Sequence, residues 1–141
     1  KVRAAWEHAE RSTEANTRIT LSVAFNYGGR WDIVQAVRQA VASGVQADQV
    51  DEALLSRHMA MAYAPDPDLF IRTGGEVRIS NFLLWQIAYS EFHFTDCLWP
   101  DFDEREIDRA IAAFASRDRR YGGVKTDISA SGEKITLAPD A

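Results

Sequence analysis

The segment DLFIRTGGEVRIS, residues 68 to 80, concentrates side chains that could bind an anion. Arg72 follows three apolar residues, and Arg78 stands two positions before Ser80. A guanidinium presents a planar fork of N–H donors that matches phosphate oxygens, and two such forks suit a diphosphate better than a single phosphate. The glycine pair at 74–75 permits backbone conformations that other residues avoid, so a ligand could approach the main chain there. The pattern predicts a diphosphate-binding loop.

Each of these residues also has a simpler interpretation. Arg72 could be a surface ion-pair partner of Glu76 or Asp68, the glycine pair could be only a turn, and Ser80 could be only a helix cap. The convergence of two arginines and a hydroxyl on one loop favours the binding hypothesis. The sequence lacks the G-x-x-x-x-G-K-[ST] pattern, so a P-loop nucleotide site is unsupported.

Length and composition limit the remaining possibilities. The chain has 141 residues, 46% of them hydrophobic, which suits one domain with a core. Its net charge of -5 argues against a protein that binds nucleic acid through a basic face. The single cysteine, Cys97, excludes an intramolecular disulfide and a cysteine zinc site, so we expect a reducing, cytoplasmic setting. The richest apolar run, Phe82 to Tyr89, is too short to span a membrane.

Hydrophobic periodicity predicts alternating helices and strands. In chain order these are a helix over residues 1–15, a strand over 19–25, a helix over 31–42, a helix over 51–59 capped by Asp51, a strand over 68–71, a helix over 81–90 capped by Ser80, a strand over 91–95 and a helix over 103–117. The order predicts an α/β fold with a mostly parallel sheet flanked by helices. Such a fold places Arg72 at the carboxyl end of a strand, where ligands collect. Residues 124–141 read as a weakly ordered tail.

Several other side chains receive structural rather than chemical interpretations. The expected core-facing stripes are Ile33, Val34, Val37 and Val41 in one helix, and Ile107, Ile111 and Phe114 in another. Metal-ligand spacing is not present among His8, His58, His93 and Cys97. The aromatic cluster of Trp85, Tyr89, Phe92 and Phe94 is expected to pack in the core.

Four segments closely resemble the undecaprenyl diphosphate synthases, the bacterial cis-prenyltransferases. They are NYGGRWDI at 26–33, DLFIRTGGEVRISNFLLWQIAYSEFHFTD at 68–96, LWPDF at 98–102 and RRYGG at 119–123. The similarity runs from about Asn16 to Gly123 and implies a cis-prenyltransferase-like fold. Residues 1–123 would then be the C-terminal part of a single cis-prenyltransferase domain.

The resemblance implies an enzyme that condenses isopentenyl diphosphate repeatedly onto farnesyl diphosphate with cis geometry, using magnesium. The implied product is undecaprenyl diphosphate, the lipid carrier of cell-wall peptidoglycan synthesis. The implied protein is a cytoplasmic homodimer that contacts the membrane peripherally through its lipid product. A non-catalytic, prenyltransferase-like partner subunit and an unrelated nucleotide-binding α/β module are the alternatives. The resemblance favours the enzyme.

The resemblance also assigns roles to individual residues. It assigns isopentenyl diphosphate binding to Arg72, Arg78, Ile79 and Ser80. It places Glu91, the acid after IAY, in the magnesium site. It predicts that Arg120 and Gly122 reach the active site of the partner subunit.

The sequence departs from the family pattern in two ways. Val77 stands where relatives often carry histidine or another polar group, so the resemblance gives this position no proton or metal role. The family's Asp-Gly-Asn-Gly-Arg-Trp loop, which supplies the essential magnesium-binding aspartate, has no match here. We therefore expect the catalytic aspartate upstream of Lys1, and we expect these 141 residues alone to be inactive.

Overall fold

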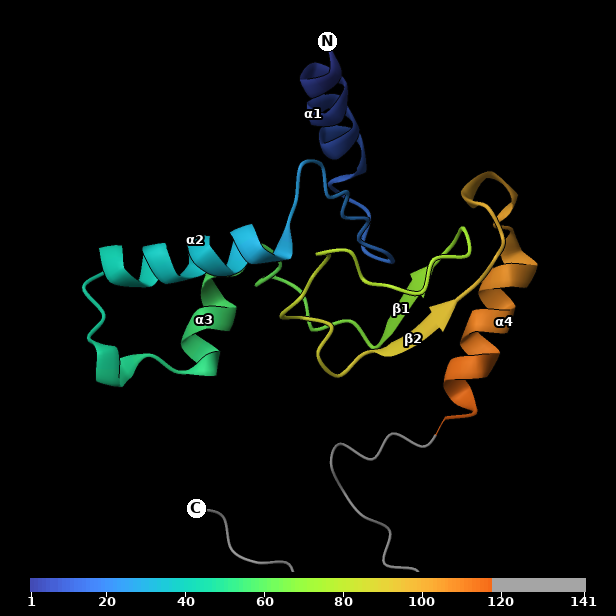
Figure 1. Ribbon diagram of the computed structural model, residues 1–141. Coiled ribbons are helices and arrows are strands. Elements are labelled where there is room, and N and C mark those ends of the chain that lie inside the picture. The colour runs from blue at the N-terminus through green and yellow to red at the C-terminus, as the bar shows by residue number, and fades with distance from the viewer. Residues whose placement is uncertain (118–141) are drawn as a thin grey trace, which may run out of the picture. The chain divides into compact units, whose positions relative to one another are not determined.

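The computed structural model describes residues 1–117 and divides into two compact units (Figure 1). The first unit comprises Lys1–Ala62, and the second begins at Tyr63. Within residues 1–117, no helix has both the length and the apolar character that crossing a membrane requires. The predicted tail at 124–141 lies outside the described residues.

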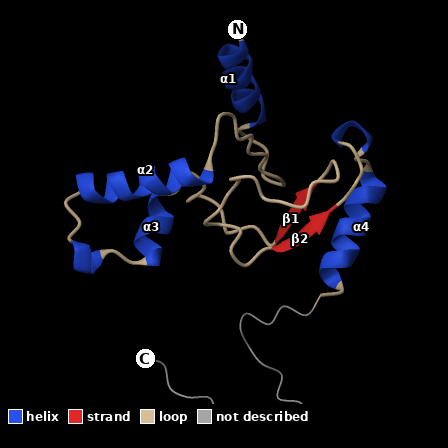
Figure 2. Cartoon of the chain, in the orientation of Figure 1, coloured by secondary structure: helices blue, strands red, loops and turns tan. Residues whose placement is uncertain are grey.

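The first unit is helical (Figure 2). Its elements are α1 (Val2–Thr13), α2 (Gly29–Ala42), the short 3-10 helix η1 (Ala47–Gln49) and α3 (Glu52–His58). Asp51 caps α3 as predicted, because its Oδ1 accepts a hydrogen bond from the Leu54 amide at 2.6 Å. Helix α2 packs against α3.

The face of α2 that is buried differs from the predicted one. Ala36 and Ala40 are buried, whereas Val34, Val37 and Val41 of the expected stripe are exposed. Residues four apart share one helix face, and two alanines on that face let a neighbouring backbone approach closely. The prediction that the valines face the core of this unit is therefore wrong.

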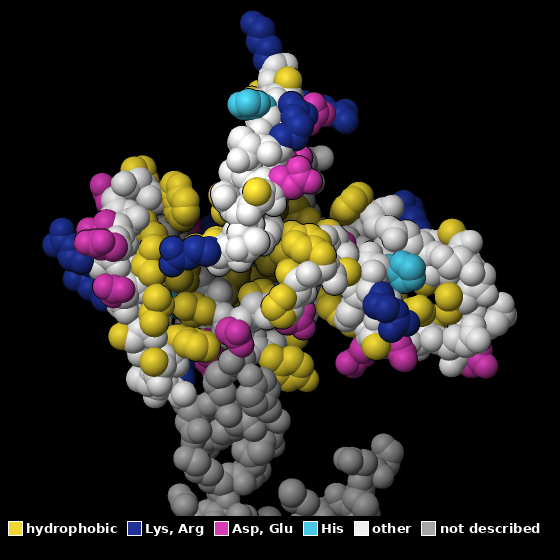
Figure 3. Space-filling model, turned by 180° about the vertical axis from the view of Figure 1, so that it is seen from behind, with side chains coloured by type: hydrophobic (Ala, Val, Ile, Leu, Met, Phe, Trp, Pro, Cys, Tyr) yellow, Lys and Arg dark blue, Asp and Glu magenta, His cyan; other side chains and the backbone are white. Residues whose placement is uncertain are grey.

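The segment Ile19–Phe25 forms no strand, although its sequence predicts one. Its apolar side chains lie at the surface, with Ile19 and Leu21 each 83% exposed, and hydrophobic side chains are visible on the molecular surface in Figure 3. A strand is stable only when a neighbouring strand completes its hydrogen bonds and covers its side chains. Among the described residues, β-strands occur only in the second unit.

The second unit contains the predicted parallel strand pair. Strands β1 (Leu69–Arg72) and β2 (Glu91–Phe94) run in parallel, with Leu69 opposite Glu91 and Arg72 opposite Phe94. The ring of Phe70 lies 5.3 Å from that of Phe92 between centroids, which confirms a packing role for this part of the aromatic cluster. Tyr89 is 76% exposed, so the expectation that it packs in the core is wrong. The parallel pair and its adjoining helix confirm the α/β class.

Helix α4 (Glu104–Ala115) flanks this pair and packs against β2. Asp103 caps it, accepting hydrogen bonds from the amides of Arg105 and Glu106 at 3.0 and 3.3 Å. A short 3-10 helix, η2 (Trp99–Asp101), precedes it. Ala110 is fully buried, whereas Ile107 and Ile111 of the predicted stripe are 43% and 52% exposed, so the expected core face is wrong for these two residues.

The predicted helix over residues 81–90 is also wrong, because this segment consists of turns. Ser80, Asn81 and Leu83 have φ values of 46°, 64° and 45°. These left-handed conformations are incompatible with a right-handed helix. The segment is instead held by tertiary contacts. The Ser90 hydroxyl donates to the Pro67 carbonyl at 2.5 Å, and the Phe82 ring lies 6.3 Å from that of Phe70.

Candidate functional site

Arg72 organises the loop that the sequence singles out. It ends β1, so its side chain leaves the carboxyl end of the strand as predicted. One guanidinium nitrogen, Nη1, donates to Ser80 Oγ at 2.8 Å and also to the Arg78 carbonyl. These contacts close the loop over residues 73–79 onto Arg72. The structure thus brings together Arg72, Ser80 and the backbone of Arg78 around one cationic group.

Arg78 carries the second positive charge of this loop. Its Nη1 forms an ion pair with Glu76 Oε2, and the Arg78 side chain is 63% exposed. Sequence reasoning considered Glu76 as a partner of Arg72, but the structure pairs it with Arg78. Ile79 is half-buried, and Val77 is 75% exposed without a polar side-chain atom.

The two glycines have a structural role that sequence reasoning did not anticipate. Gly74 and Gly75 have φ values of 84° and 75°, which only glycine adopts readily. Their amides donate to the carbonyls of Cys97 and Thr95, at 2.9 and 3.0 Å respectively. These hydrogen bonds anchor the loop to the segment after β2. The amides of Gly74 and Gly75 are therefore already engaged within the protein.

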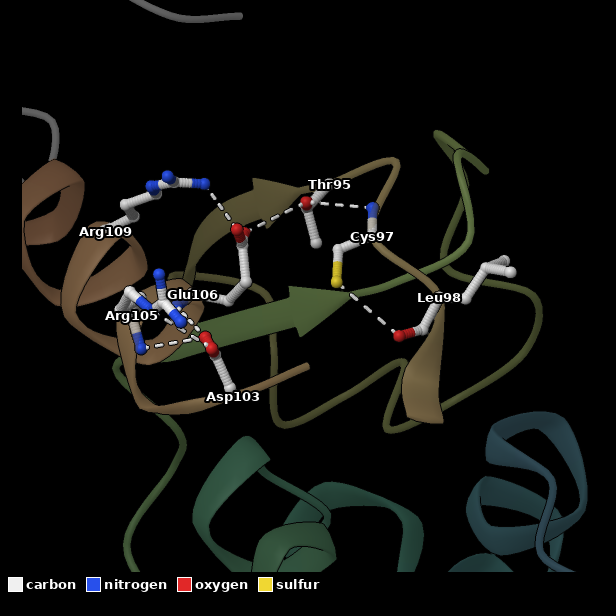
Figure 4. Close-up of polar contacts among 7 residues, drawn as sticks. All are labelled: Thr95, Cys97, Leu98, Asp103, Arg105, Glu106 and Arg109. Atoms are coloured by element: carbon white, nitrogen blue, oxygen red, sulfur yellow. Dashed lines mark hydrogen bonds and ion pairs between the residues drawn. The ribbon is translucent and has the colours of Figure 1, made fainter. Parts of the chain in front are cut away.

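The segment after β2 is in turn tied to α4 (Figure 4). The Thr95 hydroxyl donates to Glu106 Oε2 at 3.5 Å and accepts from the Cys97 amide at 3.2 Å. Glu106 also forms an ion pair with Arg109 one turn further along the helix. This chain of contacts supports the residues to which the glycine loop is bonded.

Cys97 has no sign of nucleophilic activation. Desolvation raises the pKa of its thiol above the ordinary value, and the nearby Glu106 carboxylate raises it further. A raised pKa keeps the thiol protonated at neutral pH, whereas a reactive cysteine needs a thiolate. The interpretation of Cys97 as structural therefore agrees with its surroundings.

Glu91, which the resemblance assigns to magnesium, lies away from Arg72. Glu91 begins β2, whereas Arg72 ends β1, and the parallel register separates them by three residues, or about 10 Å along the strands. Glu91 Oε2 accepts a hydrogen bond from Arg117 Nη1 at 2.6 Å. Within residues 1–117, no three His, Cys, Asp or Glu side chains cluster in a way that could hold a metal ion. The described residues therefore do not form a magnesium site by themselves.

Two predicted site residues cannot be placed. Arg120 and Gly122, with the cross-subunit role that the resemblance gives them, lie outside the described residues. Their assignment stays a prediction.

Three contacts of the site region escaped the sequence reasoning. They are the Glu76–Arg78 pair, the Glu91–Arg117 pair and the Thr95–Glu106 contact. The first pair could have been found from the sequence, because its opposite charges lie two residues apart. No local pattern signals the other two, because their partners are brought together only when α4 packs against β2.

The geometry supports binding of a diphosphate rather than covalent chemistry. The loop offers two guanidinium groups and a hydroxyl, all of which can contact phosphate oxygens. The ion pair between Glu76 and Arg78 in this loop is exposed, so an entering anion can exchange with Glu76. The described part of the loop contains no acid–base pair positioned next to a nucleophile.

The sequence of this chain is similar to a known protein family. A family model described as "Putative undecaprenyl diphosphate synthase" matches residues 1–122. An "Isoprenyl transferase" of Neisseria gonorrhoeae is 58% identical over 116 residues, which is 82% of this chain and 46% of that protein. The Escherichia coli "Ditrans,polycis-undecaprenyl-diphosphate synthase ((2E,6E)-farnesyl-diphosphate specific)" is 56% identical over 121 residues, covering 83% of this chain and 48% of its own length. The chain spans about half the length of these curated relatives.

Two solved structures of diphosphate synthases are also similar to this chain. Lavandulyl diphosphate synthase from Lavandula x intermedia, solved in complex with dimethylallyl diphosphate, superposes with a TM-score of 0.79 at 40% identity and covers 85% of this chain and 53% of its own. A probable undecaprenyl diphosphate synthase from Campylobacter jejuni superposes with a TM-score of 0.74 at 31% identity, over 86% of this chain and 56% of its own. Both neighbours are named as diphosphate synthases, and both share the fold described above.

Proposed function

The chain belongs to the undecaprenyl diphosphate synthase family, and from this premise we propose that it forms the isopentenyl diphosphate-binding part of a cis-prenyltransferase. The complete protein would condense isopentenyl diphosphate repeatedly onto farnesyl diphosphate to make undecaprenyl diphosphate. The observation that carries this proposal is the closure of one loop around Arg72, with Ser80 and Arg78 beside it.

The proposed role of these side chains is to hold and orient the substrate that supplies the nucleophilic alkene. Charge-assisted hydrogen bonds from the two guanidinium groups would fix the diphosphate. A fixed diphosphate limits the positions of its attached alkene, and such orientation lowers the barrier to carbon–carbon bond formation. Departure of the allylic diphosphate would depend on groups that the described residues do not supply.

The direct test is prenyl transfer by the complete protein. Purified protein would be supplied with farnesyl diphosphate, magnesium and labelled isopentenyl diphosphate, and butanol-extractable label would be measured. We expect multi-step incorporation of label into lipid. Absence of both incorporation and isopentenyl diphosphate binding would overturn the proposal. The alternative of a non-catalytic partner subunit predicts no transfer until a second protein is added, and no contact in the described residues favours it.

Magnesium dependence is also part of the proposal. The described residues contribute one candidate carboxylate, that of Glu91, and this group is engaged by Arg117. We therefore assign no step of the reaction to the ion. The expectation is that chelation by EDTA abolishes transfer by the complete protein and that added magnesium restores it. Full activity in EDTA would exclude the ion from the mechanism.

The cellular setting is proposed on the basis of the family resemblance. We expect a cytoplasmic homodimer that supplies the lipid carrier for peptidoglycan synthesis and contacts the membrane through its product. Arg120 and Gly122 would then reach the partner subunit. Light scattering at micromolar concentration tests the dimer, and a fully active monomer would contradict the cross-subunit role.

A further inference from the structure

The two arginines of the binding loop have different kinds of partner. Arg78 forms an ion pair with the Glu76 carboxylate, so its charge is neutralised within the loop. Arg72 donates to neutral oxygens, the Arg78 carbonyl and the Ser80 hydroxyl, and no carboxylate within residues 1–117 forms an ion pair with it. An anion that enters the loop therefore meets competition at Arg78 that it does not meet at Arg72.

We propose that Glu76 is the counter-ion that a diphosphate group displaces from Arg78, and that Glu76 thereby sets the affinity of the loop for its substrate. The inference rests on the proposed function and adds to it a residue that limits binding. Glu76 is not one of the residues to which the family resemblance gives a role.

The exposure of the pair makes such an exchange feasible. The side chains of Glu76 and Arg78 are 44% and 63% exposed, and an ion pair in contact with water is weak and screened by salt. A diphosphate offers more negative charge and more acceptor oxygens than one carboxylate, so it should replace Glu76 on Arg78.

Displacement does not remove the negative charge of Glu76 from the site. The residue stays in the same loop, two positions from Arg78, and would repel a bound anion. Asp96 is a second acid near the loop, since its Oδ1 lies 3.1 Å from the position that a Cβ on Gly75 would take. Glu76 differs from Asp96 because it contacts an arginine of the proposed site directly. Both competition and repulsion reduce affinity, so removing the charge of Glu76 should strengthen binding.

The test is the substitution Glu76→Gln in the complete protein. Calorimetry would measure the dissociation constants of isopentenyl diphosphate and of inorganic diphosphate without an allylic substrate. We expect both ligands to bind about 2- to 10-fold more tightly at low salt, which is the range expected for loss of an exposed charge interaction. The gain should shrink as ionic strength rises.

Two control variants isolate the role of the pair. Glu7 forms an ion pair with Arg3 and its side chain is 46% exposed, close to the value for Glu76. Glu7→Gln therefore removes a comparable charge from α1 and should leave both dissociation constants unchanged. In an Arg78→Gln background, Glu76→Gln should lose most of its effect, because a double-mutant cycle reports the coupling between the two side chains.

The possible outcomes separate this inference from the function it rests on. If the unsubstituted protein binds isopentenyl diphosphate and Glu76→Gln binds it equally or more weakly, the counter-ion role is wrong and the proposed function stands. If the gain persists in full in the Arg78→Gln background, Glu76 does not act through Arg78. If the unsubstituted protein binds neither ligand, the proposed function itself fails.

Discussion

Asp32 and Arg72 each join separate parts of the chain through side-chain hydrogen bonds, but the partners that they hold differ in access to solvent. Asp32 is 2% exposed, and it accepts hydrogen bonds from the Tyr27 hydroxyl at 2.8 Å and the Ala60 amide at 2.9 Å. Arg72 contacts Ser80 and Arg78, both of which are exposed. A buried carboxylate cannot replace its hydrogen-bond donors with water, whereas an exposed group can exchange partners. The first arrangement therefore suits stability, and the second suits ligand binding.

Asp32→Ala should have the largest effect, on stability. It leaves the Ala60 amide without its acceptor and removes the link between the start of α2 and the residue just after α3. We expect a loss of about 2 to 4 kcal/mol in the free energy of unfolding, measured by urea denaturation of the complete protein. Isopentenyl diphosphate affinity of the folded fraction should change little.

The control for this substitution is Asp48→Ala. Asp48 is exposed, and its replacement should stay within about 0.5 kcal/mol of the unsubstituted protein. Asp32→Asn should cost less than Asp32→Ala, because an amide oxygen can still accept from the Ala60 amide. Equal stabilities for Asp32→Ala and Asp48→Ala would show that Asp32 does not stabilise the fold, and the contrast between Asp32 and Arg72 would then be wrong.

Arg72→Ala should have the next largest effect, on binding. The substitution removes charge-assisted hydrogen bonds worth about 1.5 to 3 kcal/mol, or roughly one to two decades in isopentenyl diphosphate affinity. Binding of farnesyl diphosphate should be affected far less. Arg72→Lys should also be impaired, since an ammonium keeps the charge and loses the fork.

Arg105→Ala provides the matched control for Arg72→Ala. Arg105 is an arginine whose side chain is 81% exposed and which pairs with Asp103, so its loss should leave the affinity unchanged. If Arg72→Ala weakened the binding of both substrates equally, or unfolded the protein, Arg72 would resemble Asp32. The distinction between a stabilising residue and a binding residue would then fail.

Asp103→Ala tests whether an exposed side chain can stabilise the fold without contributing to substrate binding. The Asp103 side chain is 48% exposed, yet it caps α4 through the amides of Arg105 and Glu106. Loss of a helix cap costs about 1 kcal/mol, so thermal or urea unfolding should detect it. Asp103→Ser should restore most of the stability, while isopentenyl diphosphate affinity stays constant in both variants. A change in affinity without a change in stability would contradict the assignment of Asp103 as a cap.

Ser80→Ala should have the smallest effect. The Ser80 hydroxyl is an exposed acceptor for Arg72, and one exposed hydrogen bond contributes about 0.5 to 1.5 kcal/mol. We expect roughly a 2- to 10-fold rise in the dissociation constant of isopentenyl diphosphate and no change in unfolding. Ser80→Thr, which keeps the hydroxyl, should bind more tightly than Ser80→Ala. A stability loss as large as that of Asp32→Ala would place Ser80 among the structural residues.

Sequence reasoning predicted most of the fold correctly where local signals and tertiary packing agree. The Asp51 cap of α3 and the helix over 103–117 were predicted. A side-chain oxygen at the start of a helix, as at Asp51 and Asp103, bonds to nearby amides whatever surrounds the helix. β1 and β2 were likewise predicted, and each supplies the other with a hydrogen-bonding partner. The candidate loop was found because its arginines, glycines and serine are all close together in the sequence.

The failures lie where contacts between distant residues decide the conformation. The segment Ile19–Phe25 has a clear strand pattern, but within residues 1–117 it has no strand beside it to pair with. The segment 81–90 has helical character, but contacts to Arg72, Pro67 and Phe70 hold it in turns. Such contacts override intrinsic helix preference, which is a weak determinant of conformation by itself.

The amino-acid sequence by itself determined the loop chemistry, the helix caps, the parallel α/β class and the family, since these depend on residue types at short spacing. Only the tertiary structure decided which partner each charged group takes. It paired Glu76 with Arg78 rather than Arg72, and Glu91 with Arg117 across 26 positions of the chain. It also used the glycine amides to anchor the loop. The physical reason is that an ion pair or hydrogen bond depends on distances of a few ångströms, and packing of α4 against β2 sets those distances between residues far apart in sequence.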